Sequence, residues 1–172
     1  VAAAVILRPD DRIEGLADSK KLSAARRTVL AHEIRNRSLS WSVAWAGPSE
    51  IDSINILAAT MLAMRRAIGG LSVTPQGVRV DGNRLPDLSY DDVNLEGEAI
   101  GGGAGKVPEI SAASIIAKTT RDGIMEFLDR IHPEYGFARH KGYGTEIHCE
   151  RLREYGPCEQ HRQSFAPVRA AS

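Results

Sequence analysis

A run of glycines leading into a helix of small residues constrains the fold of this chain most strongly. The stretch GGGAGKVPEISAASIIAKTTRD extends from Gly101 to Asp122, and its pattern predicts a helix over 109–130. One narrow face of this helix consists of Ala112, Ala113, Ile115, Ile116 and Ala117. We expect that face to pack closely on a sheet. Consecutive glycines before it are typical of a loop that must come close to another group.

Strand and helix patterns alternate along the rest of the chain. The predicted strands cover 1–7, 39–47 and 77–81. The predicted helices cover 24–36, 51–70, 109–130 and 145–155. Ser19 and Ser23 are the alternative caps of the first helix. The second helix is expected to bury one face formed by Ile51, Ile54, Leu57, Ala58, Met61, Leu62 and Ile68. We expect 85–97 to be mostly loop with at most one short strand. This order indicates an α/β domain.

Length and composition indicate one soluble domain over residues 1–172. The chain is 42% hydrophobic, which is enough for a proper core. The 22 basic residues balance the 22 acidic ones, so net charge neither favours nor excludes a nucleic-acid partner. Cys149 and Cys158 are expected to be free thiols in a reducing compartment, which predicts a cytoplasmic protein. The apolar run at 1–7 is too short to span a membrane, so no membrane association is expected.

Asp81 is the sharpest single candidate for a chemical role. It ends a predicted strand and precedes Gly82. In open α/β sheets, ligands bind beyond the carboxyl ends of strands, where an aspartate can face a ligand or a metal. An ordinary Asp-Gly turn explains the same pattern. From the local residues alone, the turn is the preferred interpretation.

Basic and aromatic residues form the second group of candidates. The segments ARHKGYGT and HRQSF contain Arg139, His140, Lys141, Tyr143, His161 and Arg162. They combine phosphate-binding charge with a ring that can stack on a sugar or base. The segment DSKKLS adds Lys20 and Lys21 before a helix start. Solvated surface loops explain each group separately, but together the groups favour a polyanionic partner.

Several longer strings together resemble one family. The strings occur in the order DSKKLS, IDSINILAATMLAM, VDGN, KVPEISAASIIAK, TRD, YGFARHKGYGT and HRQSFAPV. Across nearly the whole chain they are similar to bacterial ribonuclease HII. The resemblance implies a ribonuclease H-like mixed sheet flanked by helices, with a C-terminal helical part over about 133–172 that holds the substrate. It implies cleavage of the RNA strand of RNA/DNA hybrids, and nicking 5′ of ribonucleotides embedded in duplex DNA, with Mg²⁺ or Mn²⁺.

The resemblance also assigns residues. It implies that Tyr143 contacts the nucleic acid, and Lys20, Lys21 and Lys141 are expected from their charge to contact it as well. A monomer is expected. Members of the family use four metal-binding acids, of which Asp81 in VDGN is one. Two others lie in a segment like DEAGRGPLAGP ahead of the first strand, and we expect that segment and its central strand to be missing here.

The fourth acid lies in a loop that reads GGDAK or KGDSR in the family. Ala104 stands at its position in this chain. Glu96, Glu98 and Glu109 are nearby in the sequence, but we do not expect them to substitute, and Asp122 is expected to be structural. We therefore expect an impaired enzyme. The alternatives are a module that binds hybrids without cutting them and a structural or interaction protein on the same fold.

Overall fold

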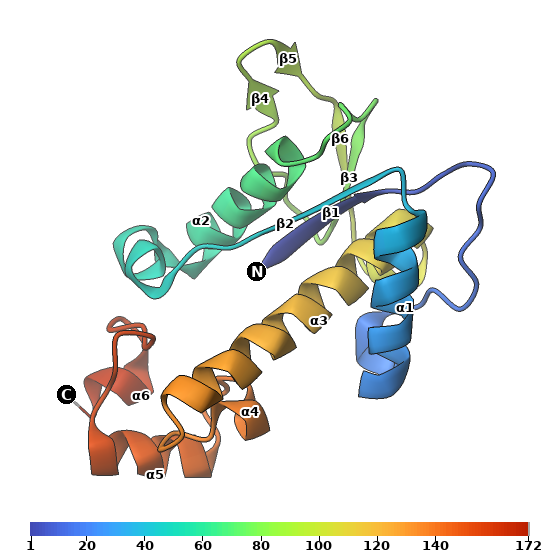
Figure 1. The fold of residues 1–172 in the computed structure, drawn as a ribbon. Coiled ribbons are helices and arrows are strands. Elements are labelled where there is room, and N and C mark those ends of the chain that lie inside the picture. Colours follow the sequence, from blue (N-terminus) through green and yellow to red (C-terminus); the bar gives the residue numbers. More distant parts are fainter. Residues whose placement is uncertain (172) are drawn as a thin grey trace. The chain divides into compact units, whose positions relative to one another are not determined.

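Figure 1 shows the computed structural model of the protein, which describes residues 1–171. The strands are β1 (Ala2–Ile6), β2 (Ser40–Ala44), β3 (Val78–Asp81), β4 (Ser89–Tyr90), β5 (Val93–Asn94) and β6 (Gly97–Ile100). The helices are α1 (Ala24–Arg37), α2 (Pro48–Gly69), α3 (Pro108–Ile131), α4 (Phe137–His140), α5 (Glu146–Tyr155) and α6 (Ala166–Arg169). Two short 3₁₀ turns are η1 (Ser19–Lys21) and η2 (Gly103–Gly105). The three strands and four helices expected from the sequence are present.

The chain divides into two compact units. The first comprises 1–45 and 60–119, and the second comprises 46–59 and 120–172. Helices α2 and α3 each contribute residues to both units. The first unit holds all the strands, and the second is helical within the part of the chain that the structure describes.

The strands pair in twos and in both directions. β1 and β2 are antiparallel, with Ala2 opposite Ala44. β3 and β6 are parallel, with Asp81 opposite Ile100, and β4 and β5 form an antiparallel hairpin. Parallel and antiparallel pairs flanked by helices confirm a mixed α/β class. Over residues 1–171 each of β1 and β3 has one paired neighbour, so the expected single sheet is present as separate pairs.

The small-residue face of α3 forms the core of the first unit. Ala112, Ile115 and Ile116 are fully buried against Leu30 and Ile34 of α1. Apolar residues of β1 and β2 complete this cluster, among them Ala3, Val5 and Val43. Close packing of α3 against strands is therefore confirmed. α1 begins behind Ser23, whose hydroxyl accepts the N–H of Arg26, so Ser23 is the cap and Ser19 is not.

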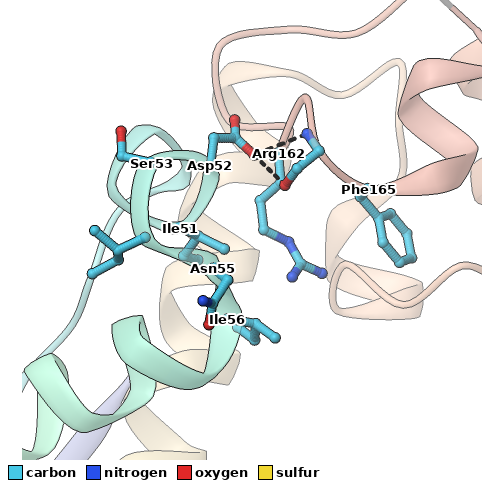
Figure 2. A pocket seen from close by; sticks show the side chains of 9 residues that line it. Ile51, Asp52, Ser53, Asn55, Ile56, Arg162 and Phe165 are labelled. Carbon is cyan, nitrogen blue, oxygen red and sulfur yellow. Dashed lines mark hydrogen bonds between the residues drawn. The ribbon is translucent and has the colours of Figure 1, made fainter.

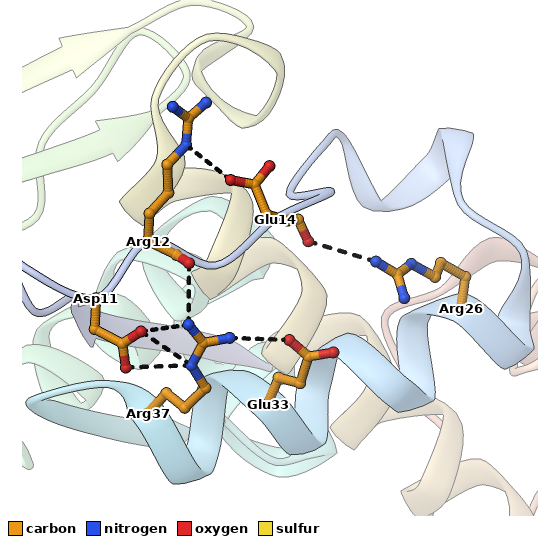
Figure 3. A network of polar contacts seen from close by, with 6 residues as sticks. All are labelled: Asp11, Arg12, Glu14, Arg26, Glu33 and Arg37. Carbon is orange, nitrogen blue, oxygen red and sulfur yellow. Dashed lines mark hydrogen bonds and ion pairs between the residues drawn. The ribbon is translucent and has the colours of Figure 1, made fainter.

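A polar network fixes the connection between β1 and η1 (Figure 3). The Arg37 guanidinium pairs with the Asp11 carboxylate and donates to the backbone carbonyl of Arg12 at 3.0 Å. The same guanidinium reaches Glu33 one helical turn earlier at 3.3 Å. Several donors of one planar group are thus satisfied at once, which holds the loop against α1.

Helix α2 differs from the prediction because it is broken at Asn55. Asn55 has φ 69°, a left-handed conformation that asparagine tolerates better than most residues. Its side-chain oxygen accepts the N–H groups of Leu57 and Ala58, so it begins a new helical segment. The predicted single buried face is wrong, since Ile54 and Leu57 are exposed. Ile68 is buried as predicted, but the other buried residues of this helix are Ala59, Ala63 and Ala67, which the predicted face did not include.

The structure differs from the prediction in two further places, the segment 85–97 and the short helices α4 and α6. The 85–97 segment holds the β4–β5 hairpin and begins β6, where we expected at most one short strand. The Tyr90 hydroxyl ties the hairpin to α2 by donating to the Arg65 carbonyl at 2.9 Å. The four-residue helices α4 and α6 are too short to produce a periodic pattern in the sequence.

The second unit has a small aromatic core of its own. Tyr135, Phe137, Leu152 and Val168 are buried together and join α4, α5 and α6. The Tyr135 hydroxyl donates to the Gly156 carbonyl at 2.7 Å, which anchors the end of α5. Over residues 1–171, no helix is both long enough and apolar enough to cross a membrane.

Neighbouring residues of α1 test the core of the first unit. Leu30 is fully buried, whereas Val29 is half exposed. Leu30→Ala should lower the free energy of unfolding by about 2–5 kcal/mol, because it removes buried methyl groups and leaves a cavity. Val29→Ala should change it by less than about 0.5 kcal/mol. Urea titration followed by tryptophan fluorescence reports on this unit through Trp41 and Trp45. Equal losses in the two variants would contradict the assignment of the core.

Candidate functional site

Asp81 lies at the end of β3, where the glycine-rich loop approaches it. The Gly82 N–H continues the ladder to the Ile100 carbonyl at 3.1 Å. The Asp81 Oδ1 atom accepts the N–H of Gly103 at 2.9 Å. The side chain is exposed, so its other oxygen can take a ligand. The glycine loop comes close to this carboxylate.

Close packing dictates the composition of the loop. A Cβ atom on Gly103 would lie 2.5 Å from the Ile110 Cδ1 atom, so any larger residue there would require the Ile110 side chain to shift. Gly102 has φ 66°, which also favours glycine. Ala104 is buried, and its carbonyl accepts the Ser111 hydroxyl at 2.6 Å. The loop is therefore tied both to β3 and to the first turn of α3.

The described residues do not fit a pair of divalent metal ions. Within 1–171, no group of three or more His, Cys, Asp or Glu side chains could hold one metal ion. A two-metal site needs several carboxylates to offset the charge of the ions. Glu109 is exposed in the first turn of α3, and Glu98 faces Arg79 at 3.9 Å. Asp122 belongs to the second unit. Asp81 is the acid that the resemblance predicts for the site, and within residues 1–171 it belongs to no group of side chains that could hold a metal ion.

Lys20 and Lys21 lie on η1 in the first unit, with exposed side chains. The turn itself is fixed, because the Ser19 hydroxyl bonds to the Ser114 hydroxyl of α3 at 2.7 Å. The Arg27 guanidinium also donates to the Ser19 carbonyl at 3.0 Å. The pair thus forms a positively charged surface on a rigid turn.

Tyr143 follows a tight turn in the second unit. Lys141 and Gly142 both adopt left-handed backbone conformations, with φ of 52° and 78°. After them the Tyr143 side chain is 61% exposed. Its backbone, by contrast, is fully bonded, since its N–H donates to the His140 carbonyl at 2.9 Å. Its carbonyl accepts from the Thr145 N–H at 2.8 Å and from the His148 ring at 2.9 Å.

Arginine and lysine surround this turn. The Arg121 guanidinium donates to the Lys141 carbonyl at 2.9 Å and lies 5.9 Å from the centre of the Tyr143 ring. The Lys141 ammonium pairs with Glu126 of α3 at 2.8 Å. An exposed ring with adjacent positive charge is an arrangement that suits stacking on a base or sugar beside phosphates.

The histidines of the predicted basic cluster are not on the surface. His140 and His161 are both 6% exposed, and they join His148 in one buried group. This result corrects the expectation that both contribute phosphate-binding charge. Sequence reasoning also missed His148, because its position on the buried side of α5 becomes meaningful only beside the other two rings.

Arg162 lies beside a pocket of about 520 Å³ in the second unit (Figure 2). The Asp52 carboxylate accepts the N–H groups of Gln163 and Ser164 at 2.8 and 2.9 Å, and also the Ser164 hydroxyl. These bonds, led by the hydroxyl, hold the pKa of Asp52 below its ordinary value. Its role is thus to fasten the 162–165 loop to the first part of α2.

Comparisons with known proteins agree with one another. A family model described as ribonuclease HII matches residues 1–168. A ribonuclease HII of Colwellia psychrerythraea is 53% identical over 175 residues, covering 98% of this chain and 81% of that protein. The crystal structure of the ribonuclease H2 from Pyrococcus horikoshii OT3 has a TM-score of 0.74 at 24% identity, covering 91% of this chain and 80% of that one. Bst-RNase HIII in complex with Mn²⁺ has a TM-score of 0.69 at 21% identity, covering 91% of this chain and 57% of that one.

The buried histidines make stability depend on pH. Burial, followed by the neighbouring His148, lowers the pKa of His161 to about 4 from 6.5. Between these values the unfolded chain binds a proton that the folded chain does not, so the free energy of unfolding falls as pH falls from 6.5 to 4. His161→Gln should reduce that fall, because the amide keeps a donor without titrating. Urea titrations followed by circular dichroism measure it, and an equal fall in the variant would contradict the assignment.

Proposed function

The chain belongs to the ribonuclease HII family, and we propose that it acts on RNA/DNA hybrids and on duplex DNA containing ribonucleotides. The family is one of ribonuclease H endonucleases. The proposed reaction is hydrolysis of the RNA strand of a hybrid, and incision 5′ of a ribonucleotide embedded in DNA. The single observation that carries the choice of substrate is the exposed Tyr143 ring on its fixed turn.

Tyr143 is proposed to stack on a sugar or base of the duplex. A ring that is 61% exposed while both its backbone groups are bonded is held ready to meet a partner. The neighbouring Arg121 supplies positive charge for adjacent phosphates, and Lys141 would add its own by exchanging Glu126 for a phosphate. We propose that the segment over about 133–172, together with Arg121, is the substrate-holding part of the chain.

Lys20 and Lys21 are proposed to contact the phosphate backbone independently of Tyr143. Their turn is fixed through Ser19 and Ser114, so the backbone from which the two exposed lysine side chains extend keeps its shape without help from a ligand. Such contacts strengthen binding to any nucleic acid and weaken with added salt. They contribute affinity, whereas Tyr143 contributes the recognition of a particular sugar or base.

Asp81 is proposed as a catalytic carboxylate and a ligand of Mg²⁺ or Mn²⁺, the ions that this hydrolysis would use. An exposed carboxylate oxygen at the end of β3 is a suitable hard ligand for either ion. When bound, such ions would activate water and stabilise the leaving oxygen. Residues 1–171 offer too few clustered carboxylates for a metal pair, and we derive no step through one.

A hybrid-binding module that does not cut is the second candidate function. Ala104 favours it, because this buried residue stands in the loop where the family pattern has an aspartate. We therefore propose that this chain binds its substrate fully but hydrolyses it poorly. We also propose that the protein is monomeric and cytoplasmic.

Matched tyrosine variants test the proposed substrate. Tyr143→Ala should weaken binding to an RNA/DNA hybrid by about ten-fold, since base–aromatic stacking is worth roughly 1–3 kcal/mol. Tyr143→Phe keeps the ring and should bind like the parent. Tyr155→Ala is the control, because Tyr155 is also exposed and also lies 5.9 Å from an arginine, Arg151. Fluorescence anisotropy in EDTA measures binding without cleavage.

Two results would contradict the proposal. One is unchanged affinity in a folded Tyr143→Ala variant, which would make Tyr143 an ordinary surface residue. The other is an equal loss in Tyr155→Ala, which would show that the assay reports on general surface changes. Circular dichroism of each variant establishes that it is folded.

A further inference from the structure

Three buried imidazoles in the second unit form a group that the proposed function does not use. His140, His148 and His161 are 6%, 4% and 6% exposed. The rings of His140 and His148 are stacked with their centres 4.1 Å apart, and that of His161 lies 5.3 Å from His148. Such a concentration of polar rings in a small core requires that their nitrogen atoms be satisfied.

Backbone groups at the ends of the cluster determine where each proton lies. The Cys158 N–H donates to His161 Nδ1 at 3.0 Å, so we assign the His161 proton to Nε2. The His161 Nε2–H group donates to His148 Nε2 at 3.1 Å, which leaves the His148 proton on Nδ1. The His148 Nδ1–H group in turn donates to the Tyr143 carbonyl at 2.9 Å. These bonds form a relay, that is, a chain of hydrogen bonds that all point the same way, from the Cys158 N–H through His161 and His148 to the Tyr143 carbonyl.

His140 supports the same turn from the other side. Its Nδ1 atom accepts the Gly142 N–H at 3.2 Å, and its Nε2 atom donates to the Tyr135 carbonyl at 2.9 Å. The carbonyl of His140 itself accepts the Tyr143 N–H at 2.9 Å. The residues on both sides of the exposed ring are therefore held by buried imidazoles.

The relay works only while the rings are neutral. An added proton on His161 Nδ1 would face the Cys158 N–H, and one on His148 Nε2 would face the His161 N–H. Burial lowers the pKa of both His148 and His161, which keeps them neutral near pH 7. The other titratable groups facing the cluster are His132, Glu134, Tyr135, Cys158 and Glu159.

We propose that His148 is a positioning residue, which sets the backbone of Tyr143 through its Nδ1–H and is itself oriented by His161. This role rests on the proposed function, because it concerns how Tyr143 is presented to the hybrid. His148 touches no substrate. His148 fixes the backbone carbonyl of Tyr143, and thereby the backbone that carries the exposed ring, at the end of the hydrogen-bond chain that starts at Cys158.

Two substitutions at His148 separate its two bonds. In His148→Asn the amide nitrogen takes the place of Nδ1, so the bond to Tyr143 is kept and the bond to His161 is lost. In His148→Gln the amide oxygen takes the place of Nε2, so the bond to His161 is kept and the bond to Tyr143 is lost. We expect His148→Asn to bind the hybrid within about two-fold of the parent at pH 7.5. His148→Gln should bind about three- to ten-fold more weakly, as for one lost hydrogen bond.

A double mutant and a spectrum complete the test. In the Tyr143→Ala background, His148→Gln should cause no further loss, because the ring that it positions is gone. Long-range ¹H–¹⁵N spectra of the parent should show His148 protonated on Nδ1, and His140 and His161 protonated on Nε2. The spectrum needs no nucleic acid, so it tests the relay separately from the proposed function.

If Tyr143→Ala weakens hybrid binding as expected, any of three results would overturn the positioning role of His148. The first is a spectrum that shows His148 protonated on Nε2. The others are equal losses of affinity in His148→Asn and His148→Gln, and a further loss of affinity from His148→Gln in the Tyr143→Ala background. Unchanged binding in Tyr143→Ala, with the spectrum as assigned, would instead overturn the proposed function, and the positioning of Tyr143 for a hybrid with it.

Discussion

Burial of the small-residue face of α3 is the constraint on which the candidate sites of the first unit depend. The helix packs closely on α1 and on β1 and β2 because alanines and short branched residues occupy that face. Its polar side chains then fix each candidate segment: Ser111 holds the glycine loop, Ser114 holds the lysine turn, and Arg121 holds the Lys141 carbonyl. A helix displaced from this core would loosen the glycine loop and the lysine turn, which belong to the first unit. The bond between Arg121 and Lys141 lies within the second unit.

The two units carry different parts of the proposed activity. In the first, Asp81 and the glycine loop form a compact turn whose shape depends on Gly103, and that turn brings one carboxylate to the end of β3. In the second, buried neutral histidines hold an exposed tyrosine, so groups that never meet the substrate control one proposed to meet it. On the proposed function, binding and hydrolysis would therefore rest on different units, and each can be assayed without the other.

Much of the fold was predictable because its main elements have strong local patterns. The α3 face and the strand ending at Asp81 follow from residue spacing, whereas the sequence left Ser19 and Ser23 as alternative caps and the structure selects Ser23. The break at Asn55 was not predictable, since the apolar residues on either side of Asn55 fit one continuous helix and only its φ of 69° reveals the new start. The histidine cluster was hidden for another reason. His148 and His161 are separated along the chain and meet only when α5 folds back on the following loop.

The central claim is that the residues present hold a hybrid but do not assemble a metal pair. The most direct test compares hybrid binding by this chain in EDTA and in Mn²⁺ at matched ionic strength, with incision followed on the same substrate. The account predicts affinities equal within about two-fold, because phosphate contacts and stacking require no divalent ion. It predicts at most weak metal-dependent incision, because residues 1–171 offer too few clustered carboxylates for a metal pair. Binding that appears only with Mn²⁺, or efficient Mn²⁺-dependent incision by this chain, would contradict it.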